Sequence, residues 1–201
     1  MAQKDTIIPV NKITLSKAIA NWEAEHVGEK LADLEEVDLI FRNIETLDSS
    51  ISSLTNCRIL SLSTNCIKQM IDINLPKLER ISLGRNRIKR ISGLTNVAST
   101  LKELWISYND ITTLDGLNDC TKLEKLYISN NNIAQMNELN KLVNCVNLVD
   151  VTFKGNPFML VDGDIKKPQD KPFSETIPEI KKRIPSIVTL DGELCKNWEI
   201  K

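Results

Sequence analysis

The sequence predicts an α/β solenoid, in which short repeats stack into a right-handed superhelix with a parallel sheet on its concave side. One pattern, LxxLxLxxNxI, occurs in five windows and once more in degenerate form, so about six repeats are expected. Alternation within LxxLxL sends its apolar residues to one face of a short strand. Because each repeat can bury its apolar face only against its neighbours, the chain is expected to form one elongated core.

An asparagine stands where each predicted strand has to turn. These residues recur at intervals of 21 to 25 residues, which is the period of leucine-rich repeats. An asparagine side chain can hydrogen-bond the turning backbone and, in a stack, the backbone of the next repeat. The first window, LEEVDLIFRNI (34–44), has Arg42 in this place. We therefore assign a structural role to the five asparagines, Asn65, Asn86, Asn109, Asn131 and Asn156.

Both ends of the repeat array carry segments that can cap it. The segment ITLSKAIANWEAEH (13–26) has apolar residues at helical spacing, with Ser16 or Thr14 as its N-cap. A second helix is expected over 175–183, with Pro178 in its first turn and Pro185 beyond its end. The predicted organisation has three parts: an N-terminal helical cap (1–33), leucine-rich repeats (34–157), and a C-terminal part (158–201). The C-terminal part consists of a loop (158–173) followed by a helical cap. The segments that return the chain on the convex side are expected to be 3₁₀ or short α turns.

Composition excludes several classes of function. Lys and Arg number 26 against 27 Asp and Glu, so no net field favours direct nucleic-acid binding. The apolar runs are too short for a membrane span, and the first residues do not read as a secretory signal, so a cytoplasmic protein is expected. The five cysteines form no CxxC pair, which argues against a disulfide framework and a zinc site. Cys57, Cys120 and Cys145 are expected to be reduced and buried.

No catalytic chemistry is predicted. The single histidine, His26, has no Cys or carboxylate partner at ligand spacing and is expected at the surface. Neither GxxxxGK[ST] nor GxGxxG occurs, so no nucleotide site is expected. We predict a protein that is not an enzyme and needs no cofactor or metal.

The concave face provides the candidate binding site. Trp105 and Tyr127 occupy equivalent positions on adjacent strands, so their rings should form one exposed aromatic patch, with basic residues beside it. Aromatic residues beside arginine are typical of binding hot spots, and a partner helix could lie in this groove. The alternative is an aromatic pair that only stiffens the sheet. The predicted site consists of Trp105, Tyr127, Tyr108, Arg80, Arg85, Glu103, Lys125 and Lys154.

A second, basic surface is expected near the C-terminus. A cluster of basic residues could bind an acidic surface such as the tails of tubulin. It consists of Lys181, Lys182 and Arg183, together with Lys166, Lys167 and Lys171 in the preceding loop. The alternative is a solvated charge cluster with no partner.

Particular letters of the repeats carry a resemblance beyond the bare pattern. Seven segments of the chain are similar to the leucine-rich-repeat light chains of axonemal outer-arm dynein. They are AIANWEAE (18–25), LSLSTNCI (60–67), ISLGRNRI (81–88), LKELWISYNDI (101–111), LYISNNNI (126–133), FKGNP (153–157) and IPSIVTLDG (184–192). These light chains fall in the short-repeat class typified by a regulatory subunit of protein phosphatase 1. The resemblance covers most of the chain.

The resemblance implies a non-catalytic subunit of a ciliary motor. The partner would be a dynein heavy chain, bound near the microtubule-binding tip of its stalk, with tubulin as a further candidate partner. The chain, monomeric on its own, would then act in the cytoskeleton, in the axoneme of a cilium or flagellum, and modulate microtubule interaction and ciliary beating. Two alternatives use the same repeat class: a regulatory scaffold of a protein phosphatase, and an adaptor for an RNA-binding splicing protein.

Overall fold

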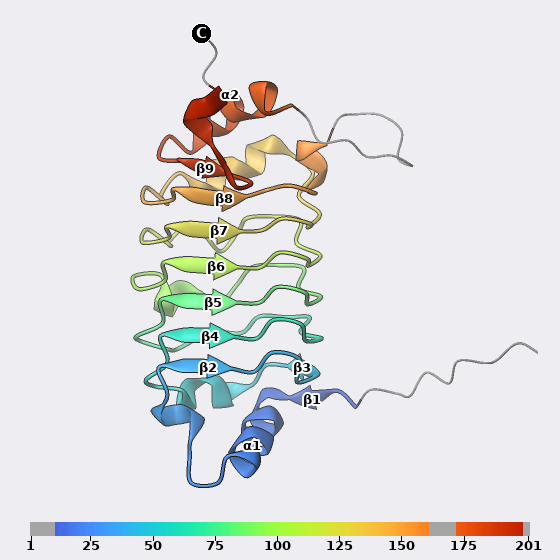
Figure 1. Cartoon of the computed structure of the whole chain (residues 1–201), viewed down its shortest axis with the longest axis vertical. Coiled ribbons are helices and arrows are strands. Elements are labelled where there is room, and N and C mark those ends of the chain that lie inside the picture. The colour runs from blue at the N-terminus through green and yellow to red at the C-terminus, as the bar shows by residue number, and fades with distance from the viewer. Residues whose placement is uncertain (1–10, 161–171, 199–201) are drawn as a thin grey trace, which may run out of the picture.

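The computed structural model describes residues 11–160 and 172–198, and these form a leucine-rich-repeat solenoid (Figure 1). Its main sheet has eight strands in the order β10-β9-β8-β7-β6-β5-β4-β2. Every neighbouring pair is parallel except β9 and β10. The predicted fold is thus confirmed. The strands are β2 (Glu36–Asp38), β4 (Ile59–Ser61), β5 (Arg80–Ser82), β6 (Glu103–Trp105), β7 (Lys125–Tyr127), β8 (Asp150–Thr152), β9 (Thr189–Leu190) and β10 (Glu193–Leu194).

Equivalent apolar residues of successive repeats stack into one core. Leu60, Ile81, Leu104, Leu126 and Val151 are paired along the sheet, and all five are fully buried. The convex side is closed by irregular segments and by the 3₁₀ helices η2 (Ser49–Ser53), η3 (Thr95–Val97) and η4 (Met136–Leu142). Short 3₁₀ turns fit here because they return the chain within few residues.

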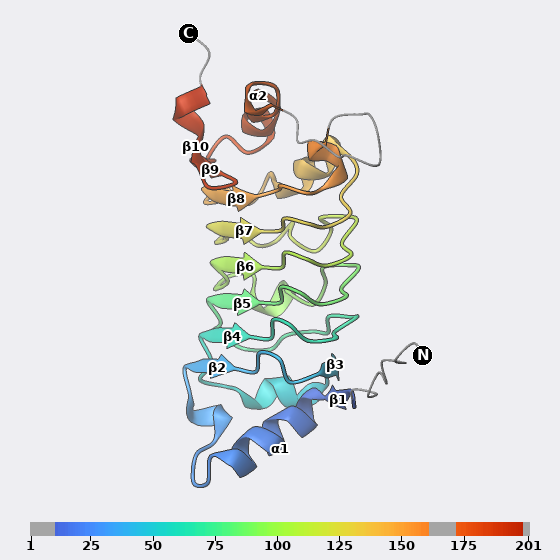
Figure 2. The same ribbon diagram turned by 45° about the vertical axis from the view of Figure 1, so that its right-hand side comes forward.

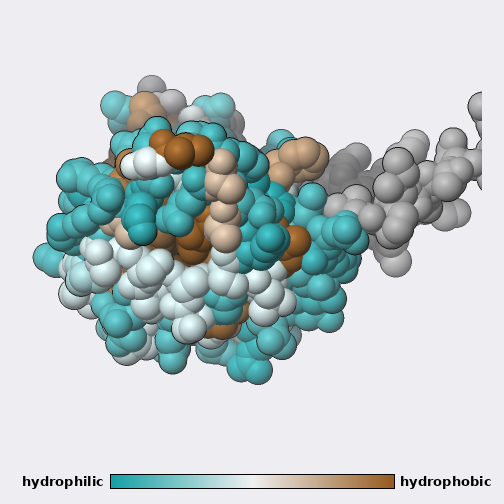
Figure 3. Space-filling model, turned by 90° about the horizontal axis from the view of Figure 1, so that it is seen from below, coloured by the Kyte–Doolittle hydropathy of each residue, from teal (hydrophilic) through white to brown (hydrophobic). Residues whose placement is uncertain are grey.

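The N-terminal cap is helix α1 (Leu15–Glu25), which buries Leu15, Ala18 and Trp22. Of the two candidate N-caps, Thr14 takes this role and accepts a hydrogen bond from the Lys17 amide at 3.2 Å. Strand β1 (Ile13–Thr14) pairs in parallel with β3 (Ile44–Thr46), a second sheet that the repeat pattern does not predict. Viewed from below, past this cap, the molecule shows a mostly hydrophilic or neutral surface with small apolar patches (Figure 3). The cap therefore covers the apolar end of the stack.

His26 follows this helix and lies partly buried at the surface, where it packs on Trp22. Its ring stacks on Trp22 with 4.0 Å between ring centroids, and its Nδ1 lies 2.8 Å from the Trp22 carbonyl oxygen. His26 thus helps to close the end of α1 as a half-buried packing residue.

The C-terminal cap is helix α2 (Phe173–Arg183), which lies over the last strands (Figure 2). It buries Ile177 and Ile180 against the core. The helix begins two residues earlier than expected, so the placement of Pro178 in its first turn is wrong: Pro178 is the sixth residue and lies inside the helix. Most of the predicted loop, together with Lys166, Lys167 and Lys171, lies outside the described residues; 157–159 form the 3₁₀ helix η5 (Pro157–Met159).

The five thiols are free, and four of them are buried. Burial raises the pKa of Cys57 to about 11, of Cys120 to about 12 and of Cys145 to about 11. These thiols therefore act as small apolar core residues, as predicted. Across residues 11–160 and 172–198, no helix is long and apolar enough to cross a bilayer.

Candidate functional site: the concave face

The asparagine column holds the turns that follow the strands. The Oδ1 atom of Asn109 accepts a hydrogen bond from the Ile88 amide of the preceding repeat at 2.9 Å. Its Nδ2 atom donates to the Leu83 carbonyl at 3.0 Å and to the Ile106 carbonyl of its own repeat at 3.1 Å. Equivalent bonds are made by Asn65, Asn86, Asn131 and Asn156. These side chains join neighbouring repeats and are not available to a partner.

The residue before the asparagine position of each repeat, which Arg42 occupies in the first repeat, has a left-handed backbone. In the five repeats whose turn residue is not glycine, φ lies between 53° and 59°, at Phe41, Thr64, Arg85, Tyr108 and Asn130. Arg85 and Tyr108 are neighbours in this column, and the Arg85 guanidinium lies 4.4 Å from the centre of the Tyr108 ring. The turn conformation thus places a cation–π pair at the rim of the concave face.

The centre of the face is the pair Trp105 and Tyr127. These residues are paired in register on β6 and β7, and their ring centroids lie 5.4 Å apart at 33°. The Arg80 guanidinium lies 4.9 Å from the Trp105 ring. The two rings do form one aromatic unit, but the expectation that they are exposed is wrong, because both are half-buried among their neighbours. Tyr108 is the exposed aromatic residue of the predicted site, at 48%.

Tyr127 is fixed by a hydrogen bond. Its hydroxyl donates to Oδ2 of Asp150 on β8 at 2.6 Å. Burial, followed by this bond to a carboxylate, raises the pKa of Tyr127 to about 12. The phenol is therefore a neutral donor that is already occupied, so a partner meets its ring and not its hydroxyl.

Other polar atoms at the centre are not occupied. Within residues 11–160 and 172–198, Nε1 of Trp105, Nε of Arg80 and Oε2 of Glu103 are buried and have no hydrogen-bond partner. Glu103 does receive a bond from Lys125 on its other oxygen, Oε1, at 3.0 Å. A buried polar group without a partner is costly, and in native structures such groups often mark a functional position. The centre thus holds two donors and one acceptor without hydrogen-bond partners beside an aromatic surface, and the acceptor, Oε2 of Glu103, lies 4.0 Å from a guanidinium nitrogen of Arg80.

A shallow hollow of about 270 Å³ joins the centre to the rim. Most of the predicted site meets there or beside it. Lys154 does not: it is exposed beyond the end of β8, and its amide bonds to Asp191 at 2.9 Å. The residues that line the hollow are Ser63, Thr64, Gly84, Arg85, Trp105, Ser107, Tyr108 and Tyr127.

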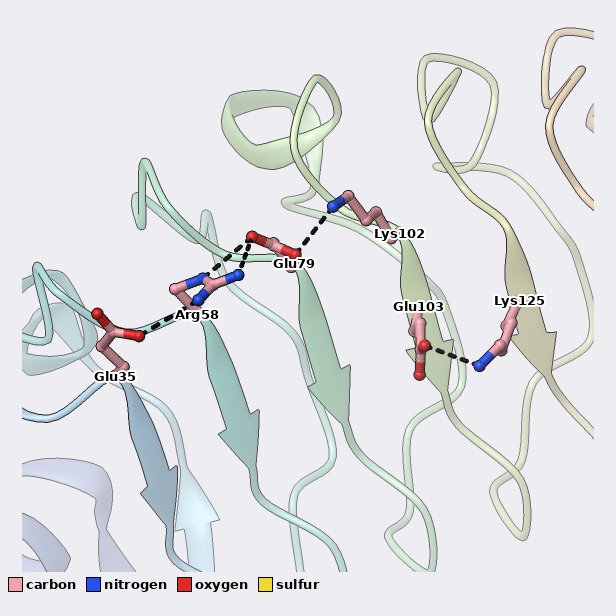
Figure 4. A network of polar contacts seen from close by, with 6 residues as sticks. All are labelled: Glu35, Arg58, Glu79, Lys102, Glu103 and Lys125. Carbon is pink, nitrogen blue, oxygen red and sulfur yellow. Dashed lines mark hydrogen bonds and ion pairs between the residues drawn. The ribbon is translucent and has the colours of Figure 1, made fainter.

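Sequence reasoning missed a ladder of ion pairs at the starts of the strands, which we call the strand-start flank (Figure 4). Arg58 bridges Glu35 at 3.3 Å and Glu79 at 2.8 Å, and Glu79 also pairs with Lys102 at 3.0 Å. These four residues each directly precede a strand, and their charges alternate from repeat to repeat. That alternation is visible in the sequence and could have revealed the ladder. It neutralises this flank.

The predicted basic cluster on α2 is smaller than expected. Arg183 is half-buried and pairs with Glu179 one turn earlier at 2.6 Å. Lys182 is exposed and Lys181 is half-buried. The cluster therefore presents fewer free charges than its three residues suggest.

The geometry defines a leucine-rich-repeat protein whose concave sheet carries the candidate binding site. The family of Leucine Rich repeats (2 copies) matches residues 99–141. Among solved structures, an internalin C2 of Listeria monocytogenes matches 64% of this chain and 60% of its own length, with TM-score 0.50 and 25% identity. An internalin InlF of the same organism matches 80% of this chain and 48% of its own length, with TM-score 0.52 and 19% identity, which shows the fold alone.

Sequence relatives identify the family. Dynein axonemal light chain 1 of Danio rerio is 43% identical over 182 residues, which cover 89% of this chain and 90% of the relative. The Homo sapiens protein is 41% identical, covering 89% and 91%, and the Chlamydomonas reinhardtii protein is 38% identical, covering 89% of both chains. The chain belongs to the dynein axonemal light chain 1 family. This membership confirms the predicted resemblance. It also confirms the prediction of a non-catalytic light chain.

Proposed function

We propose that this chain is a non-catalytic light chain of axonemal outer-arm dynein that binds a dynein heavy chain through its concave face. One observation carries the choice of face. The aromatic pair Trp105 and Tyr127 lies beside buried polar atoms of Arg80, Glu103 and Trp105 that lack hydrogen-bond partners. Family membership supports the choice of dynein as the motor.

The chemistry of the face limits what can bind there. The Trp105 and Tyr127 rings offer apolar surface, while Arg80 and Arg85 place cations beside the aromatic rings. A partner helix with apolar residues between acidic ones fits both features. An acceptor on the partner helix that reached the Trp105 N–H would give this already buried donor the hydrogen-bond partner that it lacks in the free chain.

We place this contact near the microtubule-binding tip of the heavy-chain stalk, in the axoneme of a cilium or flagellum. A light chain bound there would modulate how the motor grips its track and thereby ciliary beating. This placement rests on the family and not on the geometry of the concave face.

Affinity capture from axonemal and whole-cell extracts tests the proposed partner. The immobilised chain is expected to retain a dynein heavy chain, identified by mass spectrometry. Retention of a protein phosphatase or of a splicing protein, with no heavy chain, would favour one of the two alternative functions and refute the proposal.

The same capture tests the proposed face. Trp105→Ala should lose the heavy chain, whereas Val146→Ala should retain it because Val146 is 67% exposed and lies outside the sheet. Heavy-chain capture by Trp105→Ala at the wild-type level would refute the concave-face site while leaving the dynein assignment intact.

Contact of Lys181, Lys182 and Arg183 with tubulin is a separate proposal. Lys182 gives it an exposed cation close to the C-terminal end of the stack. Microtubule co-sedimentation of the variant Lys181→Glu, Lys182→Glu, Arg183→Glu should show loss of binding. Unchanged co-sedimentation would leave these residues as solvated charges.

A further inference from the structure

A groove of about 700 Å³ lies on the opposite flank, where the chain leaves each turn for the convex side. We call this the strand-end flank. Buried Met70 and Ile91 contribute apolar surface to the groove, and its only acidic lining residue is Asp110. Its walls carry four cationic side chains from neighbouring repeats, Lys68, Arg87, Lys89 and Arg90.

The charges of this flank are balanced at the first repeats and unbalanced at the groove. Glu45, Lys68 and Lys89 occupy equivalent positions in successive repeats. Glu45 pairs with Lys12 at 2.7 Å and with Lys68 at 2.8 Å, and these contacts lower the pKa of Glu45 to about 2. In the repeat after Lys89, the equivalent position is occupied by Thr112, which has no charge.

The remaining cations of the groove are exposed and lack close counterions. Among the described residues, Arg87, Lys89 and Arg90 make no ion pair within 4.0 Å. Asp115 is already paired with Lys141 at 2.7 Å, a contact that lowers the pKa of its carboxyl, and Arg90 acts on this carboxyl through charge and helps to lower the same pKa. By contrast, Arg58 and Lys102 of the strand-start flank are both paired.

We propose that this groove binds an acidic, extended peptide segment of a partner protein. Lys68 and Lys89 occupy equivalent positions on neighbouring repeats, which are spaced about 5 Å apart like neighbouring strands, and Arg87 and Arg90 flank Lys89 within its own repeat, so one extended segment can meet several of these cations. The apolar surface of Met70 and Ile91 would receive side chains between the acidic ones. A nucleic acid fits less well, because the described residues that line the groove include no aromatic side chain on which a base could stack. The site is separate from the concave face and does not depend on it.

Binding of a defined probe tests this site. A labelled peptide of alternating Glu and Ala should bind the wild-type chain, and its Gln and Ala counterpart should not. The variant Arg87→Glu, Lys89→Glu, Arg90→Glu should bind the acidic peptide at least about tenfold more weakly. The variant Lys17→Glu, Lys30→Glu, Lys122→Glu, with the same charge change at scattered exposed positions, should stay within about twofold of wild type.

Three results would overturn the proposal: no binding to the wild-type chain, equal weakening in both triple variants, or tighter binding of single-stranded DNA than of the peptide. Circular dichroism checks that the variants are folded. If the charge reversal prevents folding, Arg87→Gln, Lys89→Gln, Arg90→Gln replaces it, with a smaller loss of at least about threefold expected. Binding of that variant at the wild-type level would also refute the groove.

Discussion

Asn109 and Trp105 lie four residues apart in one repeat and belong to regions with opposite properties. In the asparagine column one residue type recurs, and each side chain satisfies the backbone of two repeats. In the column of Trp105 the residue type varies, with serine on β4 and β5 and then Trp105, Tyr127 and Thr152, and buried polar atoms near Trp105 are left without hydrogen-bond partners. The repeated residue holds the stack, whereas the varied residues are free to recognise a partner. The predictions below test whether these two roles are separable.

The largest effect on stability is expected from Asn109→Ala. The change leaves the Ile88 amide and the Leu83 and Ile106 carbonyls without their side-chain partner in the interior. We expect the free energy of unfolding to fall by about 3 kcal/mol, measured by urea denaturation. Asn118→Ala is the matched control, because the Asn118 side chain is exposed, and it should change the value by less than about 0.5 kcal/mol. Equal effects of the two variants would contradict the assignment of a stabilising role to the asparagine column.

A smaller effect is expected from Tyr127→Phe, which keeps the ring and removes the hydroxyl. Loss of the bond to Asp150 should lower the free energy of unfolding by about 1 kcal/mol at pH 8. The folded-state pKa of about 12 lies above the ordinary value of 10.0, so this contribution is complete below pH 10 and lost as the pH rises through 12. Urea denaturation at pH 8 and pH 11.5 should show the difference from wild type shrinking. A difference independent of pH would contradict the role of the phenol proton.

The predicted and unpredicted parts of the molecule differ in their physical origin. The LxxLxL alternation predicts the sheet and its register, since a one-residue slip would expose the leucines. Strands β1, β3 and β10 lie outside the LxxLxL segments, so the repeat pattern does not predict them. Equivalence of Trp105 and Tyr127 was readable from the repeat. Their partial burial was not, because it depends on how closely Arg80 and Asp150 approach from the flanking strands.

The charged flanks were also only partly readable. The run RNRIKR (85–90) shows the groove cations in the sequence, and Lys68 stands at the position equivalent to Lys89. Whether such charges are paired depends on which residue the next repeat offers. On the strand-start flank, Glu79 forms ion pairs with Arg58 and Lys102 of the neighbouring repeats. On the strand-end flank, the repeat after Lys89 has the uncharged Thr112 at the equivalent position.

The smallest stability effect is expected from Thr64→Asn in the left-handed turn column. Thr64 has φ of 56°, where a β-branched residue is strained and asparagine is tolerated. The variant should gain about 0.5 kcal/mol in the free energy of unfolding, measured by thermal denaturation. Thr112→Asn, at a position without positive φ, should give no gain. A loss at Thr64 would mean that its side chain contributes more to the stack than its backbone costs.

The most direct measurement is the affinity of Trp105→Ala for the heavy-chain segment that the wild-type chain binds, taken together with its unfolding curve. Loss of the contacts with Tyr127 and Arg80 should cost about 1 kcal/mol of stability, so the variant remains folded. Affinity should fall by at least about tenfold, as for a binding hot spot. A folded Trp105→Ala chain that binds the segment as tightly as wild type would contradict the assignment of recognition to the concave face.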